Sequence, residues 1–323
     1  MCSVISVVNN LFNTLKLVFN MAKRQFFAKF FVVVFIVGLL FFTFGRAYNK
    51  WVDGFYLKNI FITTPYNPCW EIAYTHEEQE EVERILDQPF YYFAKGRQCY
   101  SFVSEDGKYI LKFLKCQRMR LPDMCQVSWL PQFLEEWRQK KEHEKQERMK
   151  HLFTSYWLAR KELSEESGVL YVHLNPTSCT TKKVKLYNKI GMEYALDIGE
   201  VPFALQRKAE MVFPLFQDLL SEGRKDEARK RIDQLIEIIA CRARKAIADI
   251  DNSWITRNNV GFLEKSAMYI DIGTFARDAS VNTKEGVQRD FHKLKPLIAW
   301  LHQKDPELEA YIQKKIAEAI TQF

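Results

Sequence analysis

The chain lacks the cysteine patterns typical of small disulfide-rich domains and of structural zinc sites. Its seven cysteines are an odd number, and no two of them form a Cys-x-x-Cys pair. This spacing predicts neither a disulfide framework nor a zinc site. We expect a reducing environment for the globular part, while the six cysteines beyond the N-terminus leave pairing open.

Repeats and a zinc-protease motif are also missing. The sequence contains no internal repeat and no low-complexity tract, which argues against a repeat architecture. His143-Glu144 begins a His-Glu-x-x-His pattern, but Glu147 stands where the second histidine would be. The helical zinc-binding motif that this pattern encodes is therefore excluded.

The chain has little excess charge outside its N-terminus. Residues 1–58 carry seven basic side chains and one acidic one, whereas the other 265 residues carry 40 basic and 39 acidic ones. A nucleic-acid-binding domain carries its basic excess on the folded part. We therefore expect no nucleic-acid partner, and the basic residues around an apolar N-terminal segment point to a membrane.

The apolar N-terminal segment is long enough to span a bilayer. Residues 30–45 carry no charge, and extension back to Phe26 gives 20 residues with only Lys29 charged. This length predicts a transmembrane helix over 26–45, with a cleaved secretory signal as the alternative reading. Residues 1–25 form a preceding segment with an apolar face suited to the membrane surface. The basic residues on the two flanks barely decide the orientation, and a cytoplasmic globular part is favoured.

Composition and patterning predict an α+β fold in two lobes. The 323 residues are 47% hydrophobic and 27% charged, which is sufficient for a large core. Residues 46–88 are expected to connect the span to an N-lobe at 89–206, rich in strands, with one long helix from 131 to 163. A mostly helical C-lobe should follow at 207–323. The predicted helices there are 209–221, 225–247, 287–303 and 306–320, the last starting at the Asp305 cap and Pro306.

Metal-binding side chains flank two short apolar strands between Ala248 and Phe275. Asp251 and Asn259 precede the first strand, and Asp271 follows the second. Carboxylate and amide oxygens brought together by a hairpin are ligands that Mg²⁺ prefers. Asn259 and Asp271 are therefore the predicted metal ligands.

A strand hairpin earlier in the chain carries a lysine with apolar neighbours. Asp106-Gly107 predicts a tight turn between strands at 98–104 and 108–115. Lys112 lies in the second of these strands, where burial of an unpaired ammonium group is costly. Lys112 therefore requires a partner or a functional use.

These features occur in the order found in the protein-kinase-like superfamily, which the segment 90–275 resembles. A strand turn containing Gly96 precedes Lys112, and Asp251, Asn259 and Asp271-Ile-Gly273 follow. The resemblance implies ATP and Mg²⁺ as cofactors. It also implies that Gly96 and Lys112 bind the nucleotide, that Lys112 and Asp251 are catalytic, and that Asn259 and Asp271 hold the metal.

The chain departs from the kinase pattern at several positions. Ala94 and Cys99 replace two loop glycines, and Ile272 replaces the phenylalanine of Asp-Phe-Gly. The His-Arg-Asp triplet reads Asp249-Ile250-Asp251, eight residues before Asn259 instead of five. Asp249 is therefore an alternative base, and Asn258 is an alternative metal ligand. No Ala-Pro-Glu follows, and Glu147 and Glu162 are both weak candidates for the glutamate that pairs with Lys112.

Three functions remain open from sequence. The first is a membrane-anchored phosphotransferase that uses ATP and Mg²⁺ on an unidentified acceptor. The second is a pseudokinase scaffold for a protein partner, which the eroded loop favours. The third is a membrane-tethered interaction protein without a nucleotide site, with the charged helix 131–163 as its partner surface.

Overall fold

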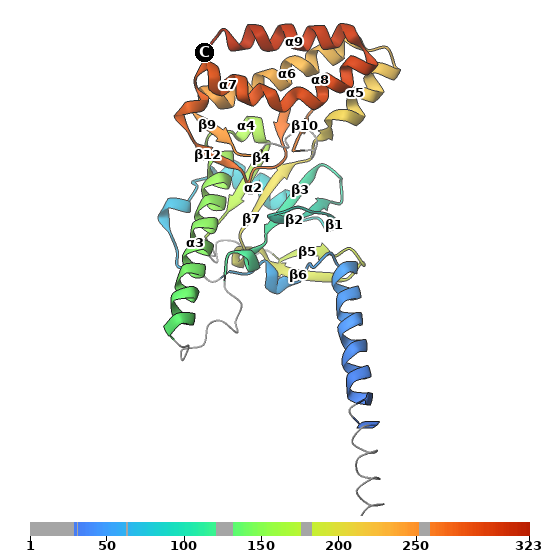
Figure 1. Cartoon of the computed structure of the whole chain (residues 1–323), viewed down its shortest axis with the longest axis vertical. Coiled ribbons are helices and arrows are strands. Elements are labelled where there is room, and N and C mark those ends of the chain that lie inside the picture. Colours follow the sequence, from blue (N-terminus) through green and yellow to red (C-terminus); the bar gives the residue numbers. More distant parts are fainter. Residues whose placement is uncertain (1–28, 31, 63, 121–131, 176–182, 252–258) are drawn as a thin grey trace, which may run out of the picture. The chain divides into compact units, whose positions relative to one another are not determined.

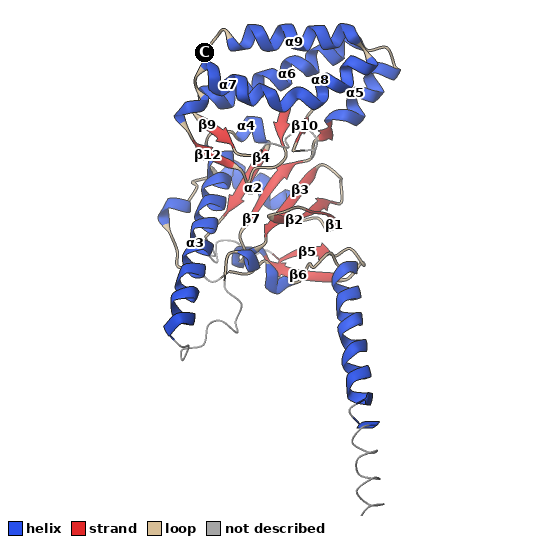
Figure 2. Cartoon of the chain, viewed as in Figure 1, coloured by secondary structure: helices blue, strands red, loops and turns tan. Residues whose placement is uncertain are grey.

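The computed structural model describes residues 29–30, 32–62, 64–120, 132–175, 183–251 and 259–323 (Figure 1). The chain divides into two units, Met1–Gly54 and Phe55–Phe323. Helices and strands alternate irregularly through the second unit, as the colouring in Figure 2 shows. The predicted α+β class is confirmed.

The first unit contains one long apolar helix, Val32–Trp51. Its most apolar window has a mean hydropathy of 1.7, and nothing in the unit buries that window. Phe35 and Phe41 are 71% and 75% exposed. A helix that is apolar on all sides needs an apolar environment. The helix is therefore consistent with a membrane anchor or a signal sequence.

The second unit is built on a mixed seven-stranded sheet with the order β4-β7-β3-β2-β1-β5-β6. β1 and β5 are parallel, and every other neighbouring pair is antiparallel. The strands are β1 Phe90–Lys95, β2 Cys99–Ser104, β3 Tyr109–Leu114, β4 Val169–His173, β5 Lys183–Tyr187, β6 Glu193–Asp197 and β7 Phe203–Arg207. The predicted hairpin at Asp106-Gly107 is confirmed by the β2–β3 pairing, with Gly107 at a φ of +71°.

Alternation along the central strands separates the two faces of the sheet. Phe102 of β2, Leu111 and Phe113 of β3 and Phe203 of β7 belong to one buried aromatic cluster. Lys112 lies between Leu111 and Phe113, so its side chain projects to the opposite face. The sheet register therefore places the lysine away from the aromatic cluster.

Residues 55–88, assigned from sequence to a connector, pack against the sheet. Phe55 contacts Tyr100 and Phe102 edge to face, with ring centroids 5.3 and 5.0 Å apart. The helix α2, His76–Ile85, begins at a Thr75–Glu78 capping box. The short 3₁₀ helices η1 Leu57–Asn59 and η2 Pro68–Trp70 precede it.

The long helix α3, Gln132–Lys161, confirms the predicted helix and is followed by α4, Ser164–Ser167. Figure 1 shows α3 alongside the sheet, and it contacts β4 and β12. A 3₁₀ turn, η3 Cys116–Arg118, follows β3.

The C-terminal helices pack mainly on one another through α6 and α9. They are α5 Val212–Ser221, α6 Lys225–Arg244, α7 Lys284–Phe291, α8 Lys295–Lys304 and α9 Pro306–Ile320. The prediction of one helix over 287–303 was wrong, because the 3₁₀ turn η7, His292–Leu294, separates α7 from α8. Pro296 stands in the first turn of α8, where its missing N–H costs least.

Two small sheets are built from strands of two or three residues, most of which lie between α6 and α7 in the chain. The predicted hairpin is formed by β10 Val260–Phe262 and β11 Ala267–Tyr269, and β8 Glu210–Met211 pairs with β10. The sequence analysis missed a second pair, β9 Ile247–Asp249 with β12 Phe275–Arg277. Each strand of that pair is only three residues long, too short for a visible alternation.

Candidate functional site

Four of the predicted site residues line one cleft of about 660 Å³. Gly96 comes from the β1–β2 turn and Lys112 from β3, while Asn259 and Asp271 flank the β10–β11 hairpin. The same cleft is lined by the segment 206–209, which leads out of β7. Residues far apart in the sequence therefore meet at one concave surface.

Lys112 is buried, with 6% of its surface exposed. The pairing of β2, β3 and β7 sets it beside Ser101 and Ala204, two small side chains that leave room for the lysine. Its ammonium group donates a hydrogen bond to the carbonyl of Ile270. Burial lowers the pKa of Lys112, and the neighbouring Cys99 and Asp271 oppose that shift.

Asn259 links the predicted base to the hairpin. Its Nδ2 donates to Oδ2 of Asp251 at 2.8 Å, and its backbone carbonyl accepts from the amide nitrogens of Ile270 and Asp271. With its amide nitrogen occupied by Asp251, the Asn259 Oδ1 is the atom available to a cation. The alternative ligand Asn258 lies outside the described residues.

Asp271 follows β11 in a segment held by hydrogen bonds within itself and to α3. Its Oδ1 accepts from the Gly273 amide at 3.0 Å. Ser155 of α3 bridges this segment, since its hydroxyl donates to the Ile272 carbonyl at 2.6 Å and accepts from the Phe275 amide at 2.7 Å. The contact with α3 holds the aspartate segment in place.

Gly273 also contacts Gln98, which belongs to the β1–β2 turn that contains Gly96. Gln98 Nε2 donates to the Gly273 carbonyl at 3.2 Å, and a Cβ on Gly273 would lie 1.7 Å from Gln98 Oε1. The absence of a side chain at Gly273 therefore makes room for Gln98, and this close approach was not predicted from the sequence.

Among the described residues, no glutamate of α3 pairs with Lys112. Glu162 instead binds Arg277, and Glu147 is exposed. Tyr156 of α3 lies near Cys99 and Asp271. Burial raises the pKa of Tyr156 well above its usual value, and the neighbouring Asp271 adds to the effect.

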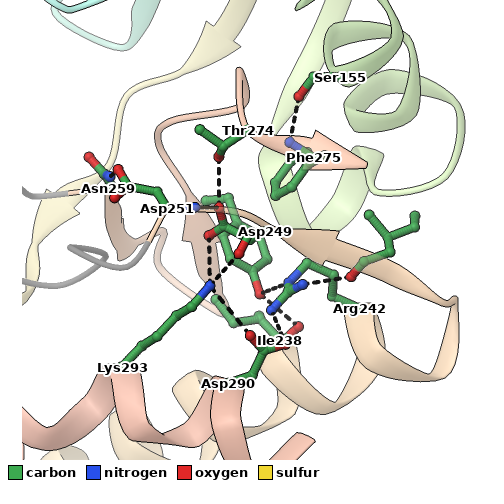
Figure 3. A network of polar contacts seen from close by, with 12 residues as sticks. Ser155, Ile238, Arg242, Asp249, Asp251, Asn259, Thr274, Phe275, Asp290 and Lys293 are labelled. Carbon is green, nitrogen blue, oxygen red and sulfur yellow. Dashed lines mark hydrogen bonds and ion pairs between the residues drawn. The ribbon is translucent and has the colours of Figure 1, made fainter. Parts of the chain in front are cut away.

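Asp249, the alternative base, is buried behind the cleft and is not one of the residues that line it. Its Oδ1 accepts from Thr274 Oγ1 at 2.7 Å and from the Asp251 amide at 3.0 Å (Figure 3). Lys293 Nζ donates to the Asp249 carbonyl at 2.5 Å. Burial raises the pKa of Asp249, although Lys293 opposes the shift. Through the hydrogen bond from the Asp251 amide, Asp249 fixes the backbone at Asp251.

Arg242, which sequence reasoning missed, anchors the same region from α6 (Figure 3). Its guanidinium donates to Asp290 Oδ2 at 2.6 Å, to the Ile247 carbonyl at 2.6 Å and to the Tyr269 hydroxyl at 2.8 Å. Ile247 begins β9 and Tyr269 ends β11, so the arginine joins the strands that carry the aspartates. No local pattern marks this arginine, because its partners lie elsewhere in the sequence.

The donor set fits Mg²⁺ in its chemistry. Among the described residues, no group of three His, Cys, Asp or Glu side chains could hold a metal by itself. Asp271 and Asn259 nevertheless offer a carboxylate and an amide oxygen to the cleft, with Asp251 hydrogen-bonded beside them. Mg²⁺ sites of this kind are completed by substrate phosphates and water.

Comparisons with known proteins show distant likeness to solved structures. No protein-family model matches the chain, and no curated protein sequence matches it. The structure is similar to that of the bifunctional kinase-methyltransferase WbdD at medium resolution, with 15% identity and a TM-score of 0.32. It is also similar to the co-crystal structure of WbdD with the kinase inhibitor LY294002, with 15% identity and a TM-score of 0.31.

The likeness spans 70% and 71% of this chain but only 43% and 45% of the two WbdD chains. The chain therefore corresponds to less than half of the length of the proteins it resembles. The similarity shows neither a nucleotide site nor catalysis in this chain.

Proposed function

We propose that the chain is a membrane-anchored, kinase-like phosphotransferase that binds ATP with Mg²⁺ in the 660 Å³ cleft. The convergence of Gly96, Lys112, Asn259 and Asp271 on that cleft carries the proposal. In this assignment residues 89–206 form the N-lobe and residues 207–323 form the C-lobe. The cleft is lined from both segments.

Each side chain has a task in phosphoryl transfer that matches its environment. Lys112 would leave the Ile270 carbonyl to donate to phosphate oxygens, whose charge favours its ammonium form. Asn259 Oδ1 and Asp271 would hold Mg²⁺, which neutralises phosphate charge when it is bound. Asp251, oriented by Asn259, would accept the proton of an acceptor hydroxyl.

The pseudokinase alternative has its own supporting observation. No described glutamate pairs with Lys112, and the lysine binds the backbone of Ile270. A lysine held in this way favours a scaffold that binds nucleotide without transferring phosphate. A partner-binding protein without a nucleotide site remains the third candidate.

Nucleotide-dependent thermal stabilisation of the full chain in detergent tests the proposal. A ligand present at 100 times its Kd stabilises a protein by about 2.7 kcal/mol. Because about 2–4 °C of Tm corresponds to each kcal/mol in a domain of this size, ATP with Mg²⁺ should raise Tm by about 5–10 °C. Asp271→Ala and Lys112→Met should each abolish the shift.

Two matched variants control for the loss of charge. Lys185→Met removes an exposed lysine from β5 of the same sheet, and Asp218→Ala removes an exposed aspartate from α5. Both should keep the wild-type response. The proposal is contradicted if the nucleotide still raises the Tm of both the Asp271→Ala and the Lys112→Met variants. Binding without hydrolysis or transfer from γ-labelled ATP would favour the scaffold.

A further inference from the structure

A second cleft, of about 390 Å³, adjoins the nucleotide cleft and is lined mainly by cations. Arg97 and Gln98 line both clefts. The second cleft also receives Lys115, Arg118, Arg148 and His151, and no carboxylate occurs among the described residues that line it. We call these side chains, together with Arg97, the basic cleft.

Three separate segments build the basic cleft. Arg97 belongs to the β1–β2 turn, Arg118 ends η3, and Arg148 and His151 stand on α3, three residues apart on one helix face. Lys115 stands behind them, with 2% of its surface exposed. Convergence from a turn, a 3₁₀ helix and a long helix distinguishes this cleft from a charged face on a single helix.

The positive charge of the basic cleft has little compensation. Within the described part of the chain, Arg118 and Arg148 form no ion pair with a carboxylate. Glu144 of α3 lies near enough to Arg148 to feel its charge, and its carboxylate binds Lys141 at 2.7 Å. Burial lowers the pKa of Lys145, and the positive charges of Arg148 and Arg118 lower it further. Like charges gathered in this way are relieved by an anion.

We propose that the basic cleft binds a phosphate group carried by a ligand other than the nucleotide. Arginine presents a planar set of donors that matches phosphate oxygens, and paired arginines bind phosphate with charge-assisted hydrogen bonds. Neither Lys112 nor Asp271 lines this cleft, so the site does not depend on the nucleotide assignment. The phosphate comes from a soluble phosphate ester or from a lipid headgroup, which share this chemistry.

An occupant of the basic cleft would touch the turn that also borders the nucleotide. Gln98 lines both clefts and donates to the Gly273 carbonyl, two residues after Asp271. The bound phosphate therefore lies next to the elements that carry the proposed phosphoryl-transfer groups.

Isothermal titration calorimetry with inorganic phosphate, on the full chain in a neutral detergent, tests the site. The double variant Arg118→Gln/Arg148→Gln should weaken phosphate binding at least about tenfold, because each charge-assisted hydrogen bond is a strong one. Lys150→Gln is the matched control, since it removes an exposed cation of α3 that does not line the cleft. All these side chains except His151 and Lys115 are exposed, so folding should be preserved.

Further titrations separate the two sources and the two clefts. Short-chain phosphatidic acid should bind more tightly than inorganic phosphate if the headgroup is a lipid, with short-chain phosphatidylcholine as control. Phosphate binding should persist in Lys112→Met, which affects only the nucleotide cleft. The proposal is overturned if neither phosphate nor phosphatidic acid binds, or if the double variant binds as well as Lys150→Gln.

Discussion

Replacement of Lys112 by methionine should separate stability from nucleotide binding. The buried ammonium group has one described hydrogen bond, to the Ile270 carbonyl, and no described carboxylate partner within ion-pair distance. Removal of a buried charge relieves a desolvation cost of several kcal/mol. The orphaned Ile270 carbonyl costs about 1–3 kcal/mol in return. Lys112→Met should therefore leave the ligand-free protein unchanged or up to about 3 kcal/mol more stable.

The pH dependence supplies a second signature of Lys112. Burial lowers its pKa in the folded state, so the unfolded chain binds more protons at alkaline pH. Stability of the wild type should therefore rise with pH up to the ordinary lysine pKa of about 10.4, relative to Lys112→Met. Urea unfolding of both proteins between neutral and alkaline pH measures the difference in unfolding free energy.

Two outcomes would refute this reasoning about Lys112. A variant that is several kcal/mol less stable would show that the lysine holds the fold together through Ile270. A stability difference that does not narrow with rising pH would show that the buried amine carries no desolvation cost. The Lys185→Met control should show neither effect, because Lys185 is exposed on β5.

Three further changes have defined outcomes. Arg242→Met should destabilise the protein by about 3–5 kcal/mol in urea unfolding, because it leaves the buried Asp290 with Lys293 alone as a described cation and removes the hydrogen bond to the Ile247 carbonyl. Asp290→Leu added to it should recover part of the loss. Ala246→Gly should stabilise by about 0.5–1 kcal/mol by calorimetry, since Ala246 has a φ of +52°. Burial lowers the pKa of His173, so unfolding free energy should fall as pH drops below about 6.5, and less so in His173→Gln.

The strand pattern predicted the central hairpin of the large sheet. Alternation and the Asp106-Gly107 turn predicted β2 and β3 within a residue, because one buried face imposes a period of two. The Asp305-Pro306 signal likewise predicted the start of α9. Local signals of this kind are strong where a cap or a turn has its own chemistry.

Contacts between segments that are distant in the sequence were not predicted. The three-residue strands β9 and β12 are held by distant elements, since Arg242 of α6 binds the Ile247 carbonyl of β9 and Ser155 of α3 binds the Phe275 amide of β12. The position of Tyr156 near Asp271 was not predicted, since the apolar stripe of a helix usually packs in a core. The convergence of the cleft was expected from motif order, but its second, basic neighbour was not.

The choice between enzyme and scaffold depends on the competition for one ammonium group. A glutamate on α3 would hold Lys112 near the phosphates by charge, but no glutamate of the described residues pairs with the lysine. Lys112 instead donates to the Ile270 carbonyl, next to Asp271 in the chain. Phosphate binding must exchange a neutral carbonyl for a charged acceptor, and that exchange is favourable for a buried ammonium. The lack of a glutamate partner among the described residues weakens the positioning of Lys112 before nucleotide binds, but it does not remove the positive charge that phosphate binding requires.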